Sequence, residues 1–226
     1  TEGENPVDFT IRQMAILREI SIDTVRYRRE HPSDDVATAL AHAEVDGRPL
    51  DDDDIESIIL LLAVAGYDTT KQATSHTVVQ LWRNADQKAW LAEDFEARIR
   101  SAVDEFVRHA SPVLDFARTA TQDVELGGQT ICAGDKVVLF FASANRDESV
   151  FPDPHRFDLT RPRTRHFGFG GGVHYCLDSS VAKAELRGLF RQILARLPDM
   201  EVGEPEPLHR HREFIHGIRH LPVRLP

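Results

Sequence analysis

The stretch from Phe167 to Leu189 constrains the chain most, because it joins a glycine-rich run to a cysteine and then to a helical pattern. It reads FGFGGGVHYCLDSSVAKAELRGL. Glycine reaches positive φ without strain and lets the backbone approach a flat or bulky ligand closely. A cysteine just ahead of a helix has its thiolate stabilised by amide N–H groups and by the helix dipole. The pattern therefore favours a thiolate that binds a soft metal such as iron; the alternative is a turn beside a buried, inert cysteine.

Composition and charge exclude some classes of partner. Hydrophobic content of 41% and charged content of 28% are ordinary for a globular protein, but a net charge of −10 argues against a nucleic-acid surface. The longest apolar run, 58–65, is too short for a membrane span, and the first residues have no signal-peptide pattern. Cys132 and Cys176 provide no disulfide framework, so we expect a cytoplasmic protein.

Apolar spacing predicts a mainly helical chain with small sheets, an α+β fold. Helices are expected over residues 9–29, 36–43, about 53–82, about 93–110 and from about 181 to a stop at Pro198. Short strands are expected between residues 116 and 140, with a hairpin turn at Gly127-Gly128. The acidic run 51–54 is expected to cap the third helix, and a metal site is its alternative.

Polar residues interrupt the middle of the long third helix at 65–70, which reads AGYDTT. Glycine in a helix interior costs about 0.5–1 kcal/mol relative to alanine, and the paired threonines can bond back to earlier carbonyls and bend the helix. This composition is typical either of a groove against a ligand or of a simple kink.

These motifs together resemble the cytochrome P450 (haem-thiolate monooxygenase) superfamily. The match to its cysteine loop comprises Phe169, Gly172, His174, Cys176 and Leu177. Asp178 departs from the pattern, because the family has glycine there. Aspartate is acceptable at the N-cap of the following helix, where its carboxylate can accept a main-chain N–H. We expect Asp178 to weaken the site, through its Cβ and its charge beside a thiolate.

The resemblance implies a role for each candidate residue. Cys176 would be the axial ligand of haem b, and the acid–alcohol pair Asp68 and Thr69 would supply protons for dioxygen activation. Further haem contacts would come from Phe169, Gly172, Ala65, Gly66, and, at the propionates, Arg118 and His174. Val113 and Leu114 would border the substrate pocket. A structural triad that locks the cysteine loop would comprise Glu105, Arg108 and Arg156.

The resemblance covers essentially residues 1–226 but only the C-terminal half of the family fold, so the missing half is a possible partner. It implies a monooxygenase, or its catalytic half, that acts on an apolar substrate such as a sterol, terpenoid or branched lipid. A ferredoxin-type donor is expected to dock on the cations near the loop: Arg161, Arg163, Arg165, His166 and Lys183.

Two other functions stay open at this point. One is a haem-free relic or binding module, which would need a partner to cover its apolar surface. The other is a metal-binding protein, which rests only on the tail histidines His209, His211, His216 and His220.

Overall fold

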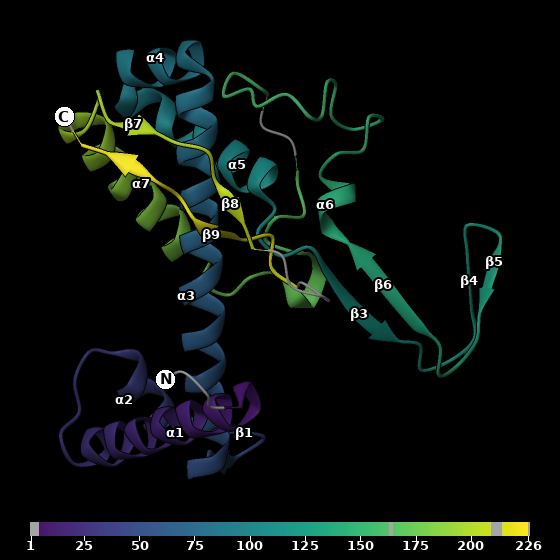
Figure 1. Cartoon of the computed structure of the whole chain (residues 1–226). Coiled ribbons are helices and arrows are strands. Elements are labelled where there is room, and N and C mark those ends of the chain that lie inside the picture. The colour runs from purple at the N-terminus through teal and green to yellow at the C-terminus, as the bar shows by residue number, and fades with distance from the viewer. Residues whose placement is uncertain (1–4, 163–164, 209–213, 226) are drawn as a thin grey trace. The chain divides into compact units, whose positions relative to one another are not determined.

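A computed structural model describes residues 5–162, 165–208 and 214–225 (Figure 1). The chain forms two compact units, residues 1–67 and 68–226. The division falls within helix α3 (Asp52–Arg83), whose first half belongs to the first unit and whose second half belongs to the second. This helix matches the one expected over about 53–82.

The first unit contains two helices and a small hairpin ahead of α3. They are α1 (Pro6–Glu30), α2 (Val36–Ala41), β1 (Glu44–Val45) and β2 (Arg48–Pro49). Asn5 caps α1 by accepting the Val7 N–H at 2.9 Å, and Asp35 caps α2 by accepting the Thr38 N–H. Val25 and Ile55 are buried, whereas much of the apolar stripe of α1 is exposed.

The acidic run before α3 caps the helix, as expected. The Asp51 carboxylate accepts the Asp54 N–H at 2.9 Å, and Arg48 lies against both carboxylates. Asp52 pairs with Arg29 and Asp53 pairs with Arg18. Across the described residues no group of three or more acids, histidines or cysteines could hold a metal ion, so the run serves as a cap.

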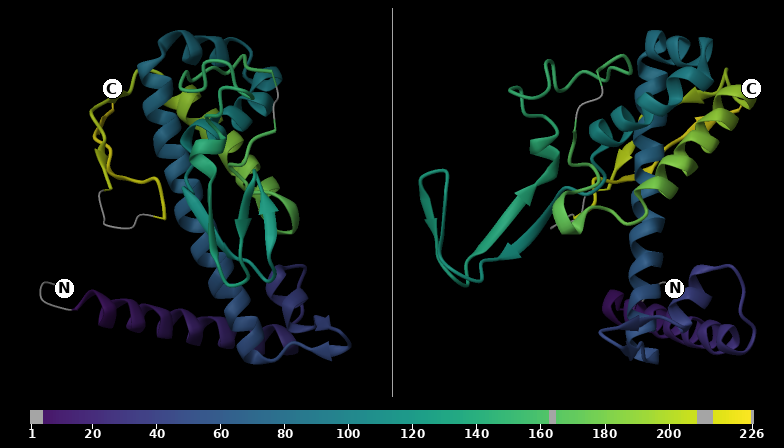
Figure 2. Two further views of the ribbon diagram at one scale, coloured as in Figure 1. Left: turned by 90° about the vertical axis from the view of Figure 1, so that its right-hand side faces the viewer. Right: turned by 180° about the vertical axis from the view of Figure 1, so that it is seen from behind.

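The core of the second unit lies among the end of α3 and three further helices. These are α4 (Ala85–Glu93), α5 (Phe95–Ala110) and α7 (Ser179–Arg196). Asp94 caps α5 by accepting the Ala97 N–H, and the helix buries a broad apolar face. Phe106 on α5 packs on Phe190 of α7, with ring centroids 4.9 Å apart. Figure 2 shows these helices from two further sides.

Antiparallel strand pairs complete the second unit. Strand β3 (Asp115–Thr119) pairs with β6 (Lys136–Phe140), and β4 (Val124–Leu126) pairs with β5 (Gln129–Ile131) around the predicted Gly-Gly turn. Helix α6 (Phe141–Ala144) follows β6. Near the end, β7 (Glu201–Val202) pairs with β10 (Val223–Arg224), and β8 (Glu206–Pro207) pairs with β9 (Ile218–His220). The α+β prediction, mainly helical with small sheets, is confirmed.

Candidate functional site

The glycine run lies directly against helix α5. A Cβ on Gly168 would stand 2.6 Å from the Val107 Cγ1 and 3.0 Å from the Val107 carbonyl oxygen. Gly170 and Gly172 adopt φ values of 69° and 63°, which side chains rarely tolerate. Two properties of glycine, close approach and positive φ, therefore set the path of the loop that leads to Cys176.

Cys176 lies between a 3-10 turn (Gly172–His174) and α7, where its N–H donates to the Phe169 carbonyl at 2.9 Å. Its thiol is half-buried, and burial is the main cause that raises its pKa above the usual value. The Asp178 main-chain N–H lowers this pKa, whereas the Asp178 charge raises it further. Cys132, by contrast, is exposed.

The environment of Cys176 suits a flat, apolar group bound through sulfur. Val173 and Leu177 flank the cysteine and are 97% and 81% exposed, so apolar surface adjoins the thiol. A thiolate is a soft ligand that suits iron. The residues present therefore fit a haem held through Cys176.

Asp178 occupies the N-cap position of α7, but its carboxylate makes none of the capping hydrogen bonds that an aspartate can make there. The Asp178 φ and ψ are −92° and 21°, outside the extended conformation that a capping side chain usually requires. Only its main-chain carbonyl joins the helix, by accepting the Ala182 N–H.

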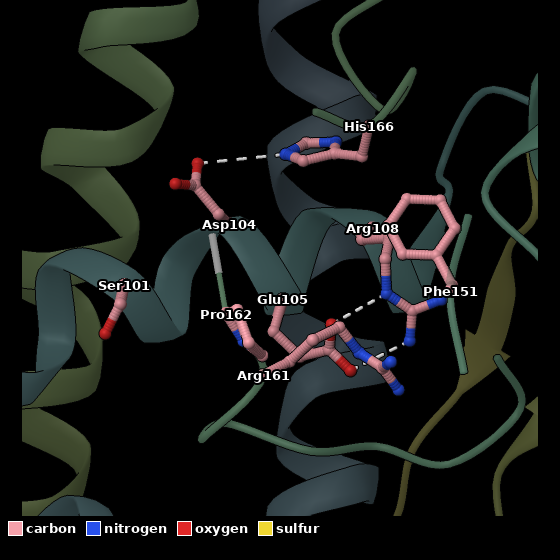
Figure 3. A pocket seen from close by; sticks show the side chains of 8 residues that line it. All are labelled: Ser101, Asp104, Glu105, Arg108, Phe151, Arg161, Pro162 and His166. Atoms are coloured by element: carbon pink, nitrogen blue, oxygen red, sulfur yellow. Dashed lines mark hydrogen bonds and ion pairs between the residues drawn. The ribbon is translucent and has the colours of Figure 1, made fainter. Parts of the chain in front are cut away.

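The Glu105–Arg108 pair of α5 is buried and bidentate (Figure 3). The guanidinium Nε and NH2 lie 2.7 and 2.8 Å from the two carboxylate oxygens, and the two side chains are 4% and 2% exposed. Arg108 also donates to the main-chain carbonyls of Asn145 and Pro154. This pair thus connects α5 to the segment that precedes the cysteine loop.

The structure differs from the prediction that the Arg156 side chain completes this triad. Arg156 is exposed and contributes only its main-chain carbonyl, which Arg108 approaches at 3.4 Å. The second guanidinium beside Glu105, after that of Arg108, comes from Arg161, with Nε 3.4 Å from Oε2. The reason is geometric: Arg161 is 10% exposed at its side chain and also donates to the Pro152 carbonyl.

The expected cationic docking cluster is contradicted for three of its five members. Arg161 is turned toward Glu105, while His166 and Lys183 are turned toward the buried Asp104. Arg165 is exposed, and Arg163 lies outside the described residues. Cationic side chains in a chain of negative net charge need not face solvent. Here the buried acidic side chains of α5 attract them into the protein.

Asp68 and Thr69 lie on α3, which remains α-helical throughout the AGYDTT segment, so the helix is not interrupted there. The Asp68 carboxylate lies 2.6 Å from the Lys71 ammonium, one helical turn later. Ala65 and Gly66 are exposed on the part of α3 that belongs to the first unit.

The other candidate residues lie in strand β3 and its surroundings. Arg118 is on β3, half-buried, and donates to the Ala117 carbonyl at 3.0 Å. Val113 and Leu114 are half-buried ahead of β3, where Val113 forms a bridge with Ile215. His174 is exposed in the cysteine loop.

Asn145 is a residue of the site that sequence reasoning missed. It is fully buried; its side-chain oxygen accepts the Phe167 N–H at 2.7 Å, and its amide nitrogen donates to the Ser111 hydroxyl at 2.9 Å. It therefore holds the start of the cysteine loop against the end of α5. In the sequence, the one feature that could have pointed to Asn145 is an amide side chain in a short segment, 144–148, that follows an apolar strand.

The tail histidines do not form a metal cluster within the described part of the chain. His209 and His211 lie outside the described residues. His216 stacks on His76, with centroids 4.1 Å apart, and accepts a hydrogen bond from it at its main-chain oxygen. Burial lowers the pKa of His76, and likewise that of His109, to about 4, with neighbouring cations adding to the effect.

Comparisons with known proteins agree on one family. The model of the family described as Cytochrome P450 matches residues 14–210. The methyl-branched lipid omega-hydroxylase of Mycobacterium tuberculosis is 46% identical over 197 residues, which are 87% of this chain and 46% of that protein. The linalool 8-monooxygenase of Pseudomonas putida is 44% identical, over 88% of this chain and 48% of that protein.

A solved structure agrees with these relatives. A Mycobacterium marinum cytochrome P450 in complex with pseudoionone matches with a TM-score of 0.92 and 46% identity, over 98% of this chain and 53% of that one. The chain thus spans about half the length of the proteins it matches. In the described residues, no helix is both long and apolar enough to cross a membrane. On the matched residues and the cysteine-loop geometry, the chain belongs to the cytochrome P450 family.

Proposed function

We propose that this chain is the haem-binding half of a haem-thiolate monooxygenase. The observation that carries the proposal is the placement of Cys176: a half-buried thiol at the start of α7, at the end of a glycine run packed on α5. The family implies a haem cofactor, and we assign it as haem b. Cys176 would bind its iron through sulfur.

When bound, a haem iron with a thiolate ligand activates dioxygen, and the thiolate favours cleavage of the O–O bond. The chain's own residues would bind and orient the group. Arg118 and His174 would hold its propionates, and Phe169, Gly172, Ala65 and Gly66 would border the porphyrin. Glu105 and Arg108 would keep the cysteine loop in place from α5.

Asp68 and Thr69 would supply protons for dioxygen activation. The Asp68 carboxylate lies 2.6 Å from the Lys71 ammonium, and both side chains are partly exposed. Proton delivery by Asp68 would therefore begin with its side chain leaving Lys71.

The substrate would be an apolar lipid, terpenoid or sterol, with Val113 and Leu114 at the edge of its pocket. Supporting this assignment, the relatives include a methyl-branched lipid omega-hydroxylase, a linalool 8-monooxygenase and a steroid C26-monooxygenase. The electron donor would be a ferredoxin-type protein. The two free cysteines support a cytoplasmic location.

The test is a reduced, CO-bound difference spectrum of the chain reconstituted with haem. We expect the Soret band of a haem thiolate in the unmodified chain and in Cys132→Ser, and its loss in Cys176→Ser. A thiolate band that survives in Cys176→Ser and disappears in Cys132→Ser would contradict the assignment. No haem binding by any variant would instead favour a haem-free binding module.

A further inference from the structure

Helix α5 carries a second buried acid, Asp104, beside the Glu105 of the triad. Asp104 is 8% exposed, and its Oδ1 lies 2.7 Å from the Lys183 ammonium of α7. The same oxygen lies 3.7 Å from the His166 Nε2 (Figure 3). Burial alone raises the pKa of Asp104, but the nearby His166 ring and the hydrogen bond and charge of Lys183 outweigh burial and lower it. The carboxylate is therefore ionised and attracts groups from both sides of the cysteine loop.

His166 transmits this contact to the glycine run. Its Nδ1 accepts the Gly168 N–H at 3.1 Å, so the ring proton resides on Nε2, the nitrogen that faces Asp104. Gly168 in turn lies against Val107 of α5 without room for a Cβ. Asp104 thus faces one nitrogen of the His166 ring, and the other ring nitrogen binds the start of the glycine run.

Lys183 transmits the contact to the cysteine itself. Its ammonium lies 5.2 Å from the centroid of the Phe169 ring, within the range of a cation–π interaction. The Phe169 carbonyl accepts the Cys176 N–H at 2.9 Å. A continuous series of contacts therefore joins Asp104 to the residue that carries the thiol.

We propose that Asp104, with His166 and Lys183, positions the loop that presents Cys176, independently of the Glu105–Arg108 pair. Asp104 is a positioning residue, because it acts through His166, Lys183 and Phe169. The two acids hold different segments. Glu105 holds the segment 145–161, whereas Asp104 holds the cysteine loop and the start of α7. The proposal rests on the proposed function only in taking Cys176 as the ligand.

The test measures how fast a disulfide reagent modifies Cys176 in the haem-free 226-residue chain, in a Cys132→Ser background with one thiol. Loss of a charge-assisted hydrogen bond changes a local opening equilibrium by about tenfold or more. The observed rate near neutral pH is divided by the thiolate fraction, which each variant's own thiol titration gives. We expect Asp104→Asn and Lys183→Gln each to raise this corrected rate by about tenfold. The corrected rate reports access to the thiol, because the difference in thiol ionisation between variants has been removed.

Glu96→Gln is the matched control, because Glu96 pairs with Arg191 and so also joins α5 to α7, but at the surface. We expect Glu96→Gln to leave the rate within twofold of the background, and the Asp104→Asn/Lys183→Gln double variant to be no faster than either single variant. Unchanged rates in both single variants, an equal rise in Glu96→Gln, or additive effects in the double variant would overturn the proposal. If Asp104→Asn does not fold, Lys183→Gln still tests the proposal. The rate of thiol modification is measured without haem, so a failure of the chain to bind haem would not change it.

Discussion

The Nε of Arg161 lies 3.4 Å from Oε2 of Glu105, close enough for an ion pair but without a hydrogen bond, and Arg108 binds the same carboxylate. Arg161→Gln removes a cation from a site where Glu105 keeps one partner. We expect it to lower the free energy of unfolding by about 2–4 kcal/mol, because an interrupted buried ion pair leaves charge less well compensated. Urea unfolding followed by circular dichroism measures the change.

Arg156→Gln is the control for this prediction. Its side chain is exposed, and its contribution to the network is a main-chain carbonyl that the substitution retains. We expect a change within about 0.5 kcal/mol. The opposite order of effects, with Arg156→Gln the more destabilising, would restore Arg156 as the third member.

The triad illustrates how far sequence reasoning reaches. A Glu-x-x-Arg spacing on a helix places both side chains on one face, so Glu105 and Arg108 could be paired from sequence alone. Their third partner comes from an irregular segment, 151–162, where no periodicity determines which way a side chain points. Arg156 and Arg161 are both plausible in sequence, and only the path of that segment distinguishes them.

Gly168→Ala should destabilise the cysteine loop. The added Cβ would stand 2.6 Å from the Val107 Cγ1 and 3.0 Å from the Val107 carbonyl oxygen, so the loop must move away from α5. We expect the free energy of unfolding to fall by about 1–3 kcal/mol, as for other overpacked sites. Bound haem should also dissociate faster, which absorbance measures after transfer of haem to an acceptor protein.

Gly188→Ala provides the comparison on α7. No described atom lies within 4 Å of its added Cβ, and the residue is exposed in a helix interior. Alanine there should raise the free energy of unfolding by about 0.5–1 kcal/mol. Equal stability of the two alanine variants would mean that the glycine loop does not pack on α5 in solution.

Stability should fall as the pH is lowered from about 6.5 to about 4, because of His76 and His109. Both have a pKa of about 4 in the folded chain, against an ordinary value of 6.5. Within this window the unfolded chain binds protons that the folded chain does not, so the free energy of unfolding decreases with decreasing pH. The loss is on the order of 3 kcal/mol per histidine at most.

Unfolding by urea at a series of pH values tests this expectation. His76→Gln and His109→Gln should each flatten the pH dependence within the window, and His42→Gln, at an exposed position of the first unit, should leave it unchanged. A slope that persists in the His76→Gln/His109→Gln double variant would assign the effect to other groups.

The parts of the candidate site that could be predicted are those encoded locally. Positive φ at Gly170 and Gly172 and the helix after Cys176 follow from short stretches of sequence. The inward orientation of His166 and Lys183 could not be predicted, because it depends on Asp104, some 60 to 80 residues earlier, and an aspartate is rarely buried. Cations near a loop therefore predict a docking surface only once it is known which of them pair with buried acids.

Asp178→Gly should tighten haem binding. Asp178 makes no capping hydrogen bond, so its removal costs α7 little, and its charge opposes ionisation of the nearby Cys176 thiol. A single like charge removed near a half-buried group should lower the dissociation constant for haem by about tenfold at most. Titration with haem, followed by its Soret absorbance, measures the constant.

Asp178→Asn removes the charge but keeps the side chain, so it separates the effect of charge from that of size. Glu185→Gln controls for charge elsewhere on α7. If Asp178→Gly and Asp178→Asn bind haem as the unmodified chain does, the acid after Leu177 is a neutral replacement for the family glycine.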